Sequence, residues 1–432
     1  MKAKEIFLLI FIIIAGITFY FIQTDKLHID FSSDSFWLTS LEEFKYDETR
    51  TIAPPFPSKI LLDNQHGNIN IQGTDQKNIT ISLNKAIWRK NKELADEASK
   101  KIDFMSSKKS DHIEIATIDN DLERRYIRTH YNIDVPHGME AEIRNSFGTV
   151  TVSNLGRTEI VNNHGEIDVS DISGKLDIQN SYKKVNIENV SSDCEITSKY
   201  ASIDISGVEG EVNVKNKYGE IHLDNISKKV KAEGIYCRIM GQNLPSPLNV
   251  ENSYKKISLI NIGPLTLKGH YSEIELDKTK GPCKIENKYG KIKINNLKGN
   301  LDIKGKSLKI LAKDIISDEI FISSSYKDIE IVDFSGQTKI SNSHGDITLK
   351  PYPLTHSINV EGTYSDLVFH WPDDFKYPFE ARVKTGNIKW KLPYESSFQK
   401  ENSISILKAF QEEKGKPEIY LYTSYNSIWI SR

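Results

Sequence analysis

Cysteine is almost absent from this chain. Only Cys194, Cys237 and Cys283 occur in 432 residues, with no Cys-x-x-Cys pair and no cluster of cysteine with histidine. Zinc and iron–sulfur sites need such clusters, because several thiolates or imidazoles must converge on one metal centre. No nucleophile motif or glycine-rich phosphate loop stands out either. The sequence therefore predicts no catalytic residues, no metal and no cofactor.

An excess of charge of one sign is also missing. Lysine and arginine number 57 and aspartate and glutamate 59, which leaves a net charge of -2. Such a balance creates no long-range field that attracts polyanions, so we expect no nucleic-acid partner. Lysine pairs such as Lys183-Lys184 and Lys255-Lys256 are interpreted as parts of a solvated mixed-charge surface, with an anion-binding stripe as the alternative.

Long hydrophobic runs are absent except at the N-terminus. Residues 6–23, IFLLIFIIIAGITFYFIQ, carry no charge and follow Lys2 and Lys4. A run of this length can span a bilayer, and the preceding lysines favour a cytoplasmic N-terminus. Because no small-x-small site closes the run, a retained anchor is favoured over a cleaved signal peptide. We expect a single-pass cell-membrane protein, anchored in the lipid bilayer through residues 6–23, whose C-terminal domain lies outside the cytoplasm.

Most of the remaining chain repeats itself. Segments such as QNSYKKVNI at Gln179, KNKYGEIHL at Lys215 and ENSYKKISL at Glu251 recur at steps of 17 to 20 residues. Each segment contains a short turn, such as Asn-Ser-Tyr in QNSYKKVNI, which we call the corner of the repeat. On both sides of each corner, apolar and polar residues alternate, which is the pattern of short strands. A period of this length over many turns predicts an all-β fold, a single-stranded parallel β-helix or β-solenoid with coils of about 18 residues.

Two columns of like residues are expected at the corner of the coils. Asparagine tolerates a left-handed turn and can bond from coil to coil, whereas aromatic rings in register can stack. The predicted structural ladder comprises Asn180, Asn216, Asn252, Asn287, Tyr182, Tyr200, Tyr218, Tyr254 and Tyr289. The aromatic column continues through other coils, with Ser307 in place of a ring.

The same repeat argues against disulfides. Cys194 and Cys283 share an inward strand position but lie five coils apart, or roughly 24 Å at the spacing of stacked strands. That separation is far beyond what a disulfide bridges. All three cysteines are therefore interpreted as small buried hydrophobes.

The segments that flank or interrupt the repeats differ from them in composition and pattern. Residues 1–23 are the expected stub and anchor, and residues 24–58, with Pro54-Pro55 and Pro57, are expected to be an extended or loosely ordered linker. The solenoid is placed at residues 59–365, with an inserted amphipathic helix at 85–106 that covers an end or a flank. Residues 366–432 are expected to cap the solenoid, and a helix is predicted around residues 403–414.

Aromatic residues crowd into the C-terminal part. In addition to forming a cap, they suggest a platform for sugar rings or a partner protein. The residues of this predicted platform are Tyr352, Trp371, Tyr377, Trp390 and Tyr394.

A family resemblance rests on one stretch above all. A strand, an amphipathic helix and paired strands lead into YNIDVPHGMEAEIRNSFGTVTV at Tyr131, with its Val-Pro-x-Gly and the repeats that follow. This arrangement resembles the bacterial "putative adhesin" domain family over about residues 59–365. The resemblance implies a right-handed β-helix of the cell envelope, often tethered by one transmembrane helix, and supplies no catalytic residues. The chain departs from the pattern where Lys183, Ala201, Lys255 and Asp328 replace a corner glycine.

Three functions follow as hypotheses. The first is a non-enzymatic, membrane-anchored envelope scaffold or adhesin-like module that binds an envelope polysaccharide or a membrane protein. The second is an envelope-stress accessory that acts on a membrane partner. The third is a β-helical polysaccharide-active enzyme, which needs two carboxylates about 5 to 9 Å apart in a cleft. The strand acids Asp168, Asp177, Asp204, Glu220 and Glu275 are interpreted instead as outward, solvated residues.

Overall fold

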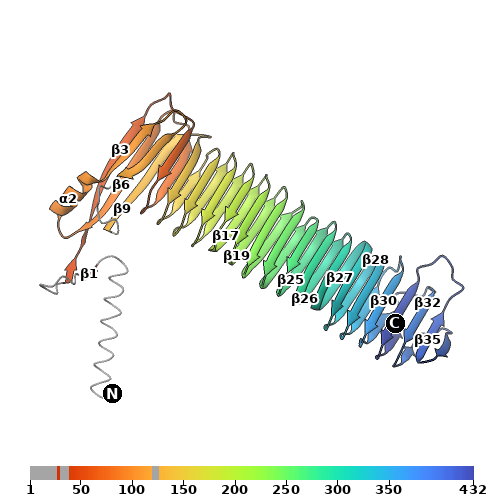
Figure 1. Cartoon of the computed structure of the whole chain (residues 1–432). Helices are drawn as coiled ribbons and strands as arrows, with labels where there is room; N and C mark the ends of the chain where they lie inside the picture. Colours follow the sequence, from red (N-terminus) through yellow and green to blue (C-terminus); the bar gives the residue numbers. More distant parts are fainter. Residues whose placement is uncertain (1–26, 30–37, 119–125) are drawn as a thin grey trace, which may run out of the picture. The chain divides into compact units, whose positions relative to one another are not determined.

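The computed structural model describes residues 27–29, 38–118 and 126–432 (Figure 1). The predicted membrane anchor therefore lies outside the described residues. Within the described ranges, no helix is both long enough and apolar enough to cross a membrane. The chain divides into two compact units, Met1–Lys183 and Lys184–Arg432.

The second unit is a stack of coils, each made of two short strands separated by a corner. In one coil, β18 (Val212–Asn216) is followed by β19 (Tyr218–Ile226), and in the next coil β20 (Val230–Ile235) is followed by β21 (Cys237–Leu244). β18 pairs in parallel with β20, and β19 with β21, so that Val212 lies beside Val230 and Ile221 beside Ile239. This register confirms the predicted parallel β-solenoid with coils of 18 residues.

The other strands of this stack follow the same scheme. They are β15 (Val185–Val190), β16 (Cys194–Thr197), β17 (Tyr200–Val208), β22 (Leu248–Ser253), β23 (Lys255–Ile262), β24 (Leu265–Gly269), β25 (Ser272–Lys280), β29 (Ile347–Pro351), β30 (Ile358–Thr363) and β31 (Leu367–His370). Three longer strands continue around corners, namely β26 (Cys283–Lys298), β27 (Leu301–Ser325) and β28 (Ile329–Ser343).

The core is the inner surface of the coils. Ile196 and Ile203 are fully buried, and Ile205 and Cys194 are 2% exposed. Residues between them in the sequence point outward, as strand alternation requires. The predicted inward positions are thus confirmed, and the three cysteines are free and buried.

The first unit contains coils as well. One face holds β4 (Lys59–Asp63), β8 (Ile113–Ile118), β10 (Glu140–Asn145), β12 (Thr158–Asn162) and β14 (Leu176–Asn180). The other face holds β5 (Ile69–Thr74), β9 (Ile127–Pro136), β11 (Val150–Ser153) and β13 (Ile167–Ile172). The coil neighbours pair in parallel, whereas β6 (Ile79–Arg89) runs antiparallel to β9 and to β3 (Glu42–Ile52). β7 (Asp103–Lys108) is antiparallel to β8, and β1 (Leu27–Ile29) to β2 (Leu38–Ser40).

Two predictions for this unit need correction. The helix expected at 85–106 is only α2 (Lys92–Lys101), because residues 79–89 and 103–108 are strands. Ile87 does pack with Ala95 and Ala98 of α2, but from strand β6. The linker expected at 24–58 contains β3, which pairs along its whole length with β6. In both places strand pairing with distant residues decided the local structure.

The C-terminal segment extends the stack out of sequence order. β36 (Ile419–Ser424) and β37 (Ile428–Ser431) pair in parallel with β30 and β31, and β32 (Phe379–Val383) and β33 (Ile388–Trp390) pair with β36 and β37. The chain end therefore lies between two segments that precede it. The helix predicted around 403–414 is wrong: β35 (Ile404–Ala409) occupies this place and pairs antiparallel with β32 and β34 (Ser397–Glu401).

Candidate functional site

The corner asparagines are buried and bond to backbone. The Asn252 side chain is 3% exposed, and its Nδ2 donates to the carbonyl oxygen of Cys237 at 2.8 Å and to that of Tyr254 at 3.0 Å. Asn216 and Asn287 make the equivalent bond to the preceding coil, to the carbonyls of Ala201 and Ser272. In the first unit, Asn180 donates to the carbonyl of Tyr182 at 2.8 Å. The bonds that Asn216, Asn252 and Asn287 make to the preceding coil therefore run from amide to backbone.

The aromatic column outside these asparagines forms exposed stacks. In the second unit, six rings follow one another with centroids 4.5 to 5.5 Å apart and planes within 12° of parallel. They are Tyr200, Tyr218, Tyr236, Tyr254, Tyr271 and Tyr289. Five of these rings are 38% to 50% exposed, and Tyr218 is half-buried. Stacking fixes the rings, while their edges and hydroxyls face solvent.

Each unit contains a further stack of four rings. Tyr326, His344, Tyr364 and Tyr425 form a second stack in the second unit, with centroids 4.7 to 5.1 Å apart. His66, Phe147, His164 and Tyr182 form one in the first unit, with centroids 4.7 to 4.9 Å apart. Between Tyr289 and Tyr326, the residue at the aromatic position is Ser307, so the column of the second unit is interrupted there.

A hollow of about 490 Å³ lies beside the six-ring stack. Gly234 and Gly269 contribute to its wall at positions where other coils carry asparagine, and Ile235 is 46% exposed there. Four of its charges are paired: Lys215 lies 3.4 Å from Glu233, and Lys268 lies 3.7 Å from Glu251. The Lys217 ammonium lies over the Tyr218 ring instead. The hollow is therefore mixed in charge and suits no single class of ion.

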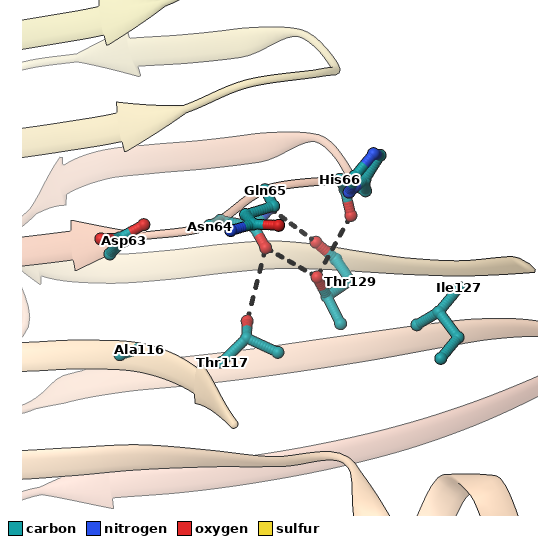
Figure 2. Close-up of a pocket in the computed structure, with 8 residues that line it drawn as sticks. All are labelled: Asp63, Asn64, Gln65, His66, Ala116, Thr117, Ile127 and Thr129. Atoms are coloured by element: carbon teal, nitrogen blue, oxygen red, sulfur yellow. Dashed lines mark hydrogen bonds between the residues drawn. The ribbon is translucent and has the colours of Figure 1, made fainter. Parts of the chain in front are cut away.

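Another hollow, of about 240 Å³, lies in the first unit (Figure 2). Figure 2 shows Asn64 and Thr129 facing each other across it, and the Thr129 hydroxyl donates to Asn64 Oδ1 at 2.7 Å. Thr117 bonds to the Tyr131 hydroxyl at 2.7 Å, and burial raises the pKa of Tyr131 to about 12. These polar groups satisfy one another, which is typical of a structural network.

Two of the five residues of the predicted aromatic platform are buried. Trp371 and Tyr377 are only 4% and 7% exposed, and Trp371 packs against Trp390, whose indole Nε1 donates to the carbonyl of Tyr394. Burial, together with a bond to Asp373, raises the pKa of Tyr377 to about 12. Tyr352 is exposed at 61%. Trp371 and Tyr377 fill the interior of the C-terminal segment, because large apolar side chains near a solenoid end gain more from mutual burial than from exposure.

Acidic side chains of the strands are engaged in ion pairs. On one outer face, Asp204 lies 2.9 Å from His222 Nδ1, and Glu220 lies 3.4 Å from His222 Nε2. Both ring nitrogens of His222 thus face a carboxylate. The Lys256 ammonium lowers the pKa of Glu275, 2.7 Å away. Within the described ranges, no cluster of His, Cys, Asp or Glu is arranged to hold a metal.

The sequence analysis did not predict a second column of asparagines. Asn225, Asn243 and Asn261 occupy equivalent bends of the second strand in successive coils, with φ between 54° and 56°. The Asn261 amide donates to Asn243 Oδ1 at 2.9 Å. In the sequence, asparagine, aspartate or glycine recurs at this bend at the spacing of the coils, because these residues best tolerate the left-handed conformation. It marks a bend and carries no chemistry of its own.

Comparison with known proteins gives one family match. Residues 256–417 match the family model described as "Toastrack DUF4097". The match begins within the solenoid expected at 59–365, ends beyond it, and covers less than half of the chain. No curated protein matches the chain.

Solved structures with a partial likeness share little sequence with the chain. A crystal structure of a "putative cell adhesion protein" from Clostridium sporogenes ATCC 15579 is 12% identical, and the alignment covers 90% of this chain and 99% of that one with a TM-score of 0.18. A "putative adhesin" from Parabacteroides distasonis ATCC 8503 is 10% identical, with 61% and 96% covered and a TM-score of 0.26. A "putative adhesin" from Parabacteroides merdae ATCC 43184 is 10% identical, with 75% and 95% covered and a TM-score of 0.21.

Proposed function

We propose that this protein is a membrane-anchored module of the cell envelope that binds an envelope polysaccharide and catalyses no reaction on it. The apolar run at residues 6–23 supports the anchor. The resemblance of residues 59–365 to the "putative adhesin" family supports an adhesin-like role for the solenoid. The observation that carries the proposal is the exposed aromatic column, because ordered rings are a costly surface feature unless they also serve recognition.

The column suits recognition for a physical reason. Each tyrosine is held by its neighbours at 4.5 to 5.5 Å, so little side-chain entropy is lost when a ligand binds. Tyrosine offers an apolar ring and a hydroxyl that donates or accepts a hydrogen bond. A polymer lying along the coils would meet this combination again at every step of about 4.8 Å.

The ion pairs of the outer faces favour binding over hydrolysis. Glycoside hydrolysis needs one carboxylic acid that is protonated and another that is ionised at a set distance. The Asp204 and Glu220 carboxylates both contact His222, and Lys256 keeps Glu275 ionised. Such pairing opposes the proton transfer that an acid catalyst must perform.

The test is a binding screen with the full chain in lipid nanodiscs. Envelope polysaccharides and peptidoglycan fragments are titrated, and released products are assayed in the same wells. We expect saturable binding without release of products, and weaker binding by the variant Tyr218→Ser. Asn249→Ala, an outward substitution on β22, serves as the matched control. Product release would instead establish an enzyme, and absence of binding to every polymer would refute the proposal.

A protein partner in the membrane is the second candidate, and one observation favours it. Strand β3 pairs with β6 and, among the described residues, with no strand on its other edge. An unpaired edge can accept a strand from another protein. Thr49→Pro removes an N–H from β3. If a membrane protein binds there, this substitution abolishes its co-purification and leaves polysaccharide binding intact.

A further inference from the structure

The aromatic column of the second unit lacks one ring, at Ser307. Strand β26 places Tyr289 beside Ser307 of β27. The next register places Ile310 beside Ile329, so Ser307 is level with Tyr326. A bond from the Ser325 hydroxyl to the Lys306 carbonyl, at 2.7 Å, confirms that these corners are adjacent. Tyr289 and Tyr326 thus stand on either side of a coil that contributes no ring.

The size of the gap follows from the strand spacing. Two steps of about 4.8 Å separate the coils of Tyr289 and Tyr326 by about 9.6 Å. The rings next to them stack at 4.8 Å, for Tyr271 with Tyr289, and at 5.1 Å, for Tyr326 with His344. One additional ring midway would therefore stack on both tyrosines. Tyr326 is 61% exposed and Tyr289 is 38% exposed, so solvent reaches both rings that border the gap.

The surroundings of the gap are basic. Between Lys278 and Lys313 the chain has eleven lysines and only two acidic residues. Lys288 and Lys306 directly precede Tyr289 and Ser307, and Lys291 and Lys309 follow them at two residues' distance. Lys291 and Lys309 are register partners on adjacent strands. Like charges placed opposite each other destabilise a sheet, and a bound anion relieves this repulsion.

Nearby acids only partly compensate these lysines. Glu273 is the register partner of Lys291, and Asp328 follows Tyr326 by two residues. Elsewhere in this unit, lysines form ion pairs, as Lys256 does with Glu275 at 2.7 Å. None of the four lysines around the gap lies within 4.0 Å of a carboxylate in the described part of the chain. Glu275 also interacts electrostatically with Lys291, so the four lysines stand near three acids.

We propose that the gap at Ser307 binds one ring of an acidic polysaccharide, a sugar that carries a carboxylate or a phosphate, between Tyr289 and Tyr326. This inference rests on the proposed binding function and assigns its ligand class and site. A sugar ring has two C–H faces, so it can stack on an aromatic ring on each side. Lys288, Lys306, Lys291 and Lys309 contact its acidic group and those of the neighbouring sugars.

The central experiment fills the gap with the protein's own ring. Ser307→Tyr completes the column, so binding should weaken at least tenfold while the melting temperature stays the same or rises. Thr266→Tyr adds a ring on an outward strand position away from the column and is the matched control. The full chain in nanodiscs is titrated with an oligomer of galacturonic acid, with its methyl-esterified neutral counterpart and with a sugar-phosphate polymer. The neutral oligomer should bind at least tenfold more weakly than the acidic one.

Two further variants separate stacking from charge. Tyr326→Ser removes one wall of the gap and should weaken binding at least tenfold, which provides a test even if Ser307→Tyr fails to fold. Lys306→Gln should weaken binding severalfold and reduce its dependence on salt, because one fewer counterion contact is made. The carboxylate and phosphate polymers show which acidic group is preferred, and tight binding of either supports the site.

The outcomes distinguish this inference from the proposed function. If the wild-type chain binds an acidic polymer and a folded Ser307→Tyr binds it equally well, the gap is not the site, although the binding function stands. Equal binding of the neutral and acidic oligomers would overturn the role of the lysines. If the wild-type chain binds no polymer of either kind, the proposed function fails as well.

Discussion

The corner asparagines should contribute measurably to stability, and Asn252 offers the clearest test. Its amide is buried and donates to two carbonyls, that of Cys237 in the preceding coil and that of Tyr254 in its own corner. Asn252→Ala removes both bonds. A buried polar group left without a partner costs about 1 to 3 kcal/mol.

One term opposes this loss. The Asn252 Oδ1 atom is buried and accepts no hydrogen bond, so its removal relieves an unfavourable burial. The loss of two hydrogen bonds lowers stability, and the removal of the unbonded Oδ1 atom partly offsets this loss. We therefore expect a net decrease of about 2 kcal/mol in the free energy of unfolding. That equals a change of about 30-fold in the unfolding equilibrium, since 1.4 kcal/mol corresponds to tenfold.

Hydrogen exchange is the appropriate assay, because coils of a solenoid can open locally. In Asn252→Ala, amides of β22 and of the adjacent corner should exchange about 30-fold faster than in the wild type. The control is Asn249→Ala in the same strand, which removes a half-buried outward side chain and should change stability by less than about 0.5 kcal/mol. Equal exchange in the two variants would refute the reasoning that these amides join the coils.

Three other predictions concern buried groups. Burial raises the pKa of Cys283 to about 12, so maleimide at pH 8 should label it only after unfolding; rapid labelling of the folded protein would contradict this burial. Ile196→Asp places an unpaired charge in the core and should remove cooperative melting of the second unit, whereas Ile196→Val should cost only about 1 kcal/mol. Burial lowers the pKa of His130 below 6.5. Because the unfolded chain then binds its proton at higher pH, stability should fall as pH drops below about 6.5, and His130→Gln should flatten this dependence in urea titrations.

The regular part of the fold was open to prediction because its information is local and repeated. Alternation within each strand showed which residues point inward, and Ile196 and Ile203 are fully buried as expected. The repeat also placed the tyrosines in one column, and Tyr236 and Tyr254 stack at 4.5 Å. Each coil contacts mainly its neighbours, so errors at one coil do not spread to others.

The ends of the stack could not be predicted in this way. Apolar residues at helical spacing suggested a helix at 85–106, but pairing of β6 with β3 and β9 places residues 79–89 in a strand. The insertion of β36 and β37 between earlier segments involves residues about 60 positions apart, and no local pattern announces it. Trp371 packs against Phe379 of β32, a strand that pairs with the inserted β36, so no local pattern could predict the burial of Trp371.

The sequence by itself determined the coil, its inward residues and the order of the aromatic column, because a period of 18 residues with strand alternation allows one stacking register. Tertiary structure decided what the column can do. In the sequence, Ser307 is only one of several departures from the repeat. The strand register shows that Ser307 lies between Tyr289 and Tyr326, with four lysines around them. The gap lies between coils of the same chain, so it exists only once the coils on both sides are folded.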